Sequence, residues 1–219
     1  MDAWQIAWFT IACAGLATLL MVPPGVLVAW LLARRQFPGR ALIEALVSLP
    51  LVLPPVATGL VLLMLLGRRG AVGRFLERLG IEVVFTWKAV VLAMAIMGFP
   101  LLVRTARAGF EQVNERYERV AATLGAPPMR VFMTISLPLA WPSVLAGAVL
   151  GFARALGEFG ATIVVAGSIP GQTRTLAVAI YSFTETGQDR QALTLVLMSV
   201  AIAFVALWAA NRLASRRAA

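Results

Sequence analysis

The feature that most constrains the fold is a run of uncharged residues near the start of the chain. From Ile6 to Ala33 no side chain carries a charge. A helix needs about 20 apolar residues to cross the hydrocarbon core of a bilayer, so this run is long enough for one span. A cleavable signal peptide would have a basic start and a shorter apolar core, whereas this chain starts with Met1-Asp2. We therefore expect a membrane-spanning helix that is retained in the mature protein.

Four further apolar runs follow, and they predict an all-α integral membrane protein. Hydrophobic residues make up 60% of the chain and charged residues only 13%, about half the charged share of a soluble domain. The second run contains Pro50, Pro54 and Pro55, so neighbouring helices must satisfy the carbonyls that these prolines leave free. We expect a bundle of about five transmembrane helices in one domain, 1–219. The expected spans are 6–33, 41–66, 83–103, 141–167 and 192–210.

The basic residues indicate orientation rather than nucleic-acid binding. The chain has 19 Lys and Arg against 10 Asp and Glu, but they are scattered through short loops instead of gathered on one face. If the N-terminus is outside, the cytoplasmic segments 34–40, 104–138 and 211–219 hold eleven arginines and the outer segments hold six. The positive-inside rule then favours an outer N-terminus and a cytoplasmic C-terminus. The four arginines of the outer loop 68–78 oppose this orientation.

The composition also excludes several kinds of chemistry. The chain has no histidine and one cysteine, Cys13, so a disulfide within the chain and the usual Cys/His metal sites are excluded. It has no Gly-x-x-x-x-Gly-Lys-Ser/Thr loop, so we expect no bound nucleotide or other cofactor. An intramembrane enzyme built on Glu158 and Arg154 would lack a second carboxylate or a histidine. A secondary transporter would be expected to show an inverted repeat, and none is visible.

The charged interlude 104–138 is too polar for a bilayer, although apolar runs flank it. Its pattern predicts a helix over 113–124, a stop at Gly125, and a second short helix over 129–135. Such a helix-turn-helix would lie on the cytoplasmic face, where small residues let another protein's backbone approach closely. The residues that suggest this docking surface are Glu118, Ala121, Ala122 and Gly125.

This interlude resembles the EAA loop of ABC importer permeases, in which a Glu-Ala-Ala group, a glycine and an Ile-x-Leu-Pro end follow at fixed spacing. Gly125 and the run 135–138 match that spacing, and Glu118 lies seven residues before Gly125, one residue further than in the general pattern. The resemblance implies the type I ABC importer permease fold and a loop that inserts into a groove on a separate ATPase subunit. The implied ATPase-coupling residues are Glu118, Ala121, Ala122, Gly125, Ile135, Leu137 and Pro138.

The segments 154–162 and 169–176 resemble the molybdate and sulfate group of these permeases. The resemblance implies a permease subunit, not an enzyme, that forms the path of an ATP-driven oxyanion importer by alternating access. Molybdate is favoured because sulfate permeases of this group are usually longer; sulfate, thiosulfate and tungstate stay as alternatives. The implied partners are a second copy of the chain, a cytoplasmic ABC ATPase that uses ATP and Mg, and a periplasmic or extracellular substrate-binding protein. The implied location is the lipid bilayer of the bacterial plasma membrane.

Several residues are candidates for the translocation path or its gate. Arg154 and Glu158 are four apart on one helix, so they can pair, either to fix helix packing or to exchange partners during transport. Arg174 either attracts the anion or docks a receptor, or it is an ordinary solvated arginine. The apolar segment 175–181 is too short to span and suggests a re-entrant outer gate. The path or gate candidates are Arg154, Glu158, Ser168, Thr173, Arg174, Thr175 and Ala179.

Overall fold

The computed structural model describes residues 2–215, with side chains up to Trp208, and this range is helical without strands, which confirms the all-α prediction. Four helices in it are long and apolar enough to cross a membrane, and a fifth crossing is possible if a bent helix pair counts as one. Arg216 and Arg217, two of the arginines that orient the chain, lie outside the described residues.

Three long helices form the centre of the molecule. Helix α1 (Ala3–Arg34) starts with a capping box at Asp2 and runs without interruption across Pro23 and Pro24. Helix α5 (Trp87–Gln112) starts at Thr86, whose hydroxyl accepts a hydrogen bond from the Lys88 N–H. Helix α8 (Leu137–Leu156) packs along α5, and α5 packs along α1. The apolar runs of the sequence thus form a bundle with α5 in the middle.

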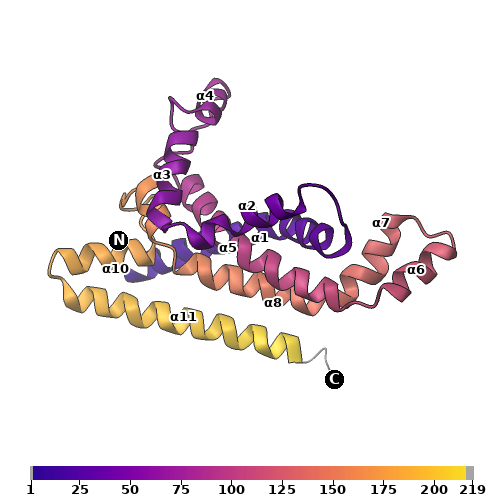
Figure 1. The fold of residues 1–219 in the computed structure, drawn as a ribbon. Helices are drawn as coiled ribbons and strands as arrows, with labels where there is room; N and C mark the ends of the chain where they lie inside the picture. The colour runs from indigo at the N-terminus through magenta and orange to yellow at the C-terminus, as the bar shows by residue number, and fades with distance from the viewer. Residues whose placement is uncertain (1, 216–219) are drawn as a thin grey trace.

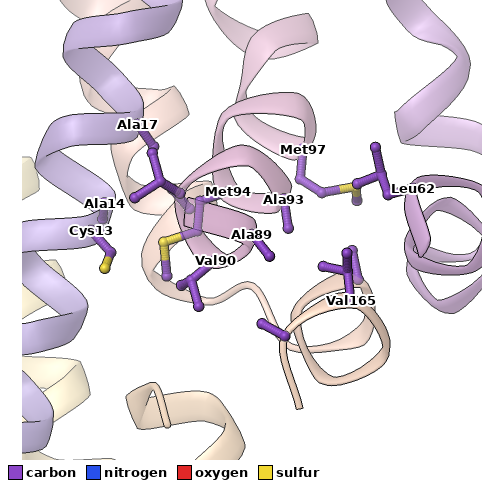
Figure 2. Packing of buried hydrophobic residues seen from close by; sticks show 14 of the residues in the cluster. Cys13, Ala14, Ala17, Leu62, Ala89, Val90, Ala93, Met94, Met97 and Val165 are labelled. Atoms are coloured by element: carbon purple, nitrogen blue, oxygen red, sulfur yellow. The ribbon is translucent and has the colours of Figure 1, made fainter. Parts of the chain in front are cut away.

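Small side chains allow these helices to approach closely. Figure 2 shows alanines of α1 facing α5 in the largest buried cluster. Where α5 crosses α8, a Cβ added to Gly98 would lie 2.8 Å from the carbonyl oxygen of Gly151, and Met21 of α1 fills the remaining space at 3.2 Å. Such contacts depend on small residues because there is little hydrophobic driving force between helices inside a bilayer.

The expected second span, 41–66, is broken. Helix α2 (Arg40–Val52) and helix α3 (Pro55–Leu66) meet at an angle of 114°. Leu53 and Pro54 both precede a proline, which disfavours helical backbone, and both are extended, with ψ of 142° and 133°. A short helix α4 (Ala71–Arg78) follows α3, and the two project sideways from the bundle (Figure 1).

The boundaries expected around the charged interlude are also wrong. Helix α5 does not end at Val103 but continues to Gln112. After helix α6 (Glu115–Thr123) comes α7 (Pro128–Val131), and this second helix does not stop at Pro138. It passes into α8 through a π-helical turn, η1 (Phe132–Ser136), in which the Leu137 N–H donates to the Phe132 carbonyl. This altered hydrogen bonding accommodates the proline in a helix that continues for another five turns or so.

The expected fourth span, 141–167, is divided as well. Helix α8 ends at Leu156, and a separate short helix, α9 (Gly160–Val165), follows after a turn. The apolar segment after it forms α10 (Leu176–Glu185), which is too short to cross a bilayer, as expected. The last expected span lies within α11 (Asp189–Ser215).

The helices place functional segments at two ends of the molecule (Figure 1). The α6–α7 hairpin lies at one end, beyond the C-terminal end of α1, and α11 runs back towards that end. The N-terminus and α10 lie at the opposite end. The start and the end of the described chain therefore lie on opposite sides of the bundle.

Candidate functional site

The α6–α7 hairpin is built by ordinary helix start and stop signals. The Asn114 side chain accepts a hydrogen bond from the Arg116 N–H at 2.9 Å and so caps the start of α6. At the other end Gly125 has a φ of +84°, a conformation that glycine adopts without strain. The N–H groups of Gly125 and Ala126 donate back to α6 carbonyls, which closes the turn.

The expected docking residues do not all face the same way. Ala122 and Gly125 are exposed, while Ala121 is half-buried. Ala121, Ile135 and exposed Pro138 line one groove of about 780 Å³ between α6 and the start of α8. Leu137 instead packs against the buried cluster of α1, α5 and α8.

The hairpin also exposes apolar side chains that the sequence analysis missed. Leu124 is 82% exposed and Met129 is 68% exposed, on either side of the Gly125 turn. Tyr117 and Val120 are exposed on α6 and line the groove. The signal in the sequence that could have revealed them is a large apolar residue in an otherwise polar loop, because exposed apolar patches mark interaction surfaces.

Glu118 points into the molecule instead of outwards. Its Oε1 accepts a hydrogen bond from Ser136 Oγ at 2.7 Å and another from Arg34 Nε at 3.1 Å. Arg34 Nη2 also donates to the Val113 carbonyl at 2.7 Å. Glu118 thus connects α6 to the end of α1 and the start of α8.

The expected pair of Arg154 and Glu158 forms, but not on one helix, because α8 ends at Leu156 and Glu158 lies in the turn that follows. Arg154 Nη1 lies 2.7 Å from Glu158 Oε2, and the Glu158 side chain is only 1% exposed. The other carboxylate oxygen accepts a hydrogen bond from the Ala161 N–H at 2.7 Å. Glu158 therefore fixes the first turn of α9 to the last turn of α8.

Helix α9 in turn packs very closely on α3. A Cβ on Gly59 would lie 2.7 Å from the Ala161 carbonyl oxygen, and one on Gly160 would lie 2.7 Å from Pro55 Cβ. The buried hydroxyls of Thr58 and Thr162, one on each of these helices, have no hydrogen-bond partner among the described residues. Thr162 was not among the expected site residues.

The path candidates after α9 form a hydrogen-bonded loop. Arg174 Nε donates to Ser168 Oγ at 3.1 Å, and Ser168 Oγ lies 3.5 Å from Ser182 Oγ on α10. Thr173 accepts from the Ile169 N–H, and Thr175 caps α10 by accepting from the Val178 N–H. Thr173 and Thr175 are buried, whereas Ser168 and Arg174 are half-buried.

Ala179 lies elsewhere. It is fully buried and packs with residues of α1 and α11 in the cluster of Ile6, Ala7, Leu176 and Leu195. The side chain expected at an outer gate is therefore part of the helix packing in this conformation.

This arrangement of helices is that of a known class of proteins. A bacterial ABC transporter involved in the import of the acidic polysaccharide alginate has a solved structure that matches with a TM-score of 0.76 at 18% identity, covering 99% of this chain and 80% of that one. The fold is therefore that of the type I ABC importer permeases, with a helical hairpin at one end of the bundle.

The sequence defines the family more closely. The chain belongs to the family of binding-protein-dependent transport system inner membrane components, which matches residues 25–219. The molybdenum transport system permease protein ModB of Escherichia coli K12 is 47% identical over 206 residues, which cover 93% of this chain and 90% of that protein. The sulfate transport system permease protein CysT of Salmonella typhimurium is 36% identical, covering 94% of this chain and 75% of that protein. The chain is thus a permease subunit of an inner-membrane transporter, not an enzyme.

Proposed function

We propose that this chain is the membrane-spanning subunit of an ATP-driven importer of molybdate. The observation that carries the proposal is the 47% identity with the molybdenum permease of Escherichia coli over nearly the full length of both chains. The lower identity of 36% with a sulfate permease makes sulfate the competing substrate. Tungstate has the same charge and tetrahedral shape as molybdate and would be carried by the same path.

The energy would come from partner subunits. Two copies of this chain would form the path, two cytoplasmic ABC ATPases would bind ATP and Mg, and an extracytoplasmic binding protein would deliver the oxyanion. ATP-driven closure of the ATPases would shift the two copies between inward-open and outward-open states, which is alternating access.

The α6–α7 hairpin would be the ATPase contact. Its exposed Ala122 and Gly125 permit close backbone approach, and its exposed Leu124 and Met129 supply apolar area. This end of the bundle would be cytoplasmic, as the excess of arginines in segments 34–40 and 104–138 favours. The N-terminus would then be outside and the C-terminus inside.

The oxyanion path would run past the α3–α9 crossing. The hydroxyls of Thr58 and Thr162, which have no hydrogen-bond partner in the described part of the chain, are neutral donors there, and neutral donors bind a dianion weakly enough for it to leave. Arg174 is half-buried beside Ser168 and just precedes α10, the helix at the opposite end from the hairpin, and it would attract the anion at the outer mouth. The Arg154–Glu158 pair would hold α9 in place without binding the anion.

Molybdenum accumulation in cells tests the proposal. The chain, co-expressed with its ATPase and binding protein in a bacterium without its own molybdate permease, should restore cellular molybdenum, measured by elemental analysis. Cells with an ATPase that cannot hydrolyse ATP are the control. Unrestored molybdenum with all three subunits present at their proper locations would contradict the proposal.

A further inference from the structure

We propose that Glu118 is a positioning residue that transmits movement of the α6–α7 hairpin to α1 and α8, and that it does not contact the ATPase. This inference rests on the proposed function, because it concerns how ATPase movement reaches the transport path. It assigns Glu118 a different task from the other residues expected to couple the two subunits.

Apolar packing anchors α6 only weakly. None of its nine residues is buried, so apolar packing holds this helix only loosely on the bundle. Polar contacts must therefore provide much of its attachment. The strongest are the two hydrogen bonds to Glu118 Oε1, from Ser136 at 2.7 Å and from Arg34 at 3.1 Å, because hydrogen bonds to an ionised group are about twice as strong as neutral ones.

The two donors to Glu118 lie next to the long helices α1 and α8. Arg34 is the last residue of α1, its side chain is 8% exposed, and it also holds the Val113 carbonyl just before α6. Ser136 is 1% exposed and ends the π-helical turn that leads into α8. A displacement of α6 therefore acts directly on the ends of two long helices of the bundle.

The position of Glu118 on α6 sets the direction of its side chain. Successive residues of an α-helix are rotated by about 100°, so Arg119 does not face the direction that the preceding Glu118 faces. Here that direction is inwards, and Glu118 is 19% exposed. The next residue, Arg119, is exposed and has no hydrogen bond or ion pair with any residue up to Trp208. The outward position in this chain thus carries a positive charge.

The experiment separates a transmitting role from a contact. The complex of this chain with its ATPase and binding protein is purified with Glu118→Ala, and ATPase co-purification, ATP hydrolysis and oxyanion uptake into liposomes are measured. Glu115→Ala is the matched control, because Glu115 lies on the same helix but is 63% exposed and 3.8 Å from Arg34. Arg34→Gln and the double variant with Glu118→Ala complete a mutant cycle.

Glu118→Ala should keep the ATPase bound and its hydrolysis active, while the number of anions moved per ATP falls by about tenfold, within the usual range of coupling between sites. The double variant should lose less than the sum of the two single variants, since both remove the hydrogen bond between Glu118 and Arg34. Glu115→Ala should transport like the wild type. If Glu118 only maintained the amount of folded complex, the number of anions moved per ATP would be the same in Glu118→Ala as in the wild type.

Two results would overturn the inference. One is loss of the ATPase from the Glu118→Ala complex, which would make Glu118 a contact; the other is an unchanged number of anions per ATP. If the Glu118→Ala protein does not reach the membrane, Ser136→Ala tests the same connection. The number of anions moved per ATP should then fall by less than in Glu118→Ala, and an unchanged number would contradict the inference. Failure of the wild type to take up molybdate would count against the substrate proposal instead. The transmitting role of Glu118 would then be measured with the oxyanion that the wild type does move.

Discussion

Replacing Arg154 by methionine should destabilise the protein more than replacing its partner Glu158 by glutamine. The Glu158 carboxylate is 1% exposed, and Arg154 Nη1 at 2.7 Å is its only charged partner among the described residues. Arg154→Met leaves a buried carboxylate with the Ala161 N–H alone, and breaking a buried pair in this way costs about 3–5 kcal/mol. The loss should appear as loosened contact between α8 and α9.

Replacing Glu158 by glutamine leaves a milder defect. Glu158→Gln keeps an oxygen that can accept from the Ala161 N–H, and the remaining Arg154 is 26% exposed, so its charge can be solvated. The cost should be about 1.5–3 kcal/mol, that of a hydrogen bond to a charged group. In the double variant no charge is left buried, so its stability should match that of Glu158→Gln alone.

Thermal unfolding of the four proteins in one detergent measures this order. The midpoint should be lowest for Arg154→Met, with Glu158→Gln and the double variant together between it and the wild type. A double variant less stable than Arg154→Met would refute the reasoning. If Arg154→Met unfolds like the wild type but no longer transports, the pair acts in the transport cycle and not in holding α9.

Three further outcomes are expected from the packing. Gly98→Ala should lower the unfolding midpoint, because its Cβ would lie 2.8 Å from the backbone of α8, whereas Gly15→Ala meets no atom within 4 Å and should not. Gly125→Val should reduce ATPase co-purification several-fold, since a non-glycine residue with left-handed backbone costs about 1–2 kcal/mol, and Gly125→Asn should be tolerated better; equal yields would contradict this. Ala179→Trp should destabilise the fold by about 1–3 kcal/mol through overpacking; unchanged stability with altered uptake would instead support a gate.

The helical class and the number of apolar runs were predictable because the bilayer imposes length and composition on any span. The breaks were not, because the same residue type acts differently in different places. Pro54 and Pro55 end one helix and start another, whereas Pro23 and Pro24 lie inside α1 and Pro138 lies within a helix that continues to Leu156. Whether neighbouring backbone can adjust around a proline depends on tertiary contacts that a single sequence does not contain.

The candidate site shows the same division. The spacing of Arg154 and Glu158 predicted their ion pair, although α8 ends at Leu156 and Glu158 lies in the turn after it instead of on the same helix. The direction of Glu118 was not predictable, because it depends on Arg34, which is 84 residues away in the sequence. The burial of Ala179 was not predictable for a related reason: its short helix is apolar whether it faces an opening or packs on α1 and α11.

The most direct test of the central claim is oxyanion uptake by liposomes that contain this chain, its ATPase and its binding protein. With ATP supplied to the ATPase side, molybdate should accumulate, and sulfate at the same concentration should stay at the level seen without ATP. ATP-dependent uptake of sulfate with none of molybdate would contradict the account.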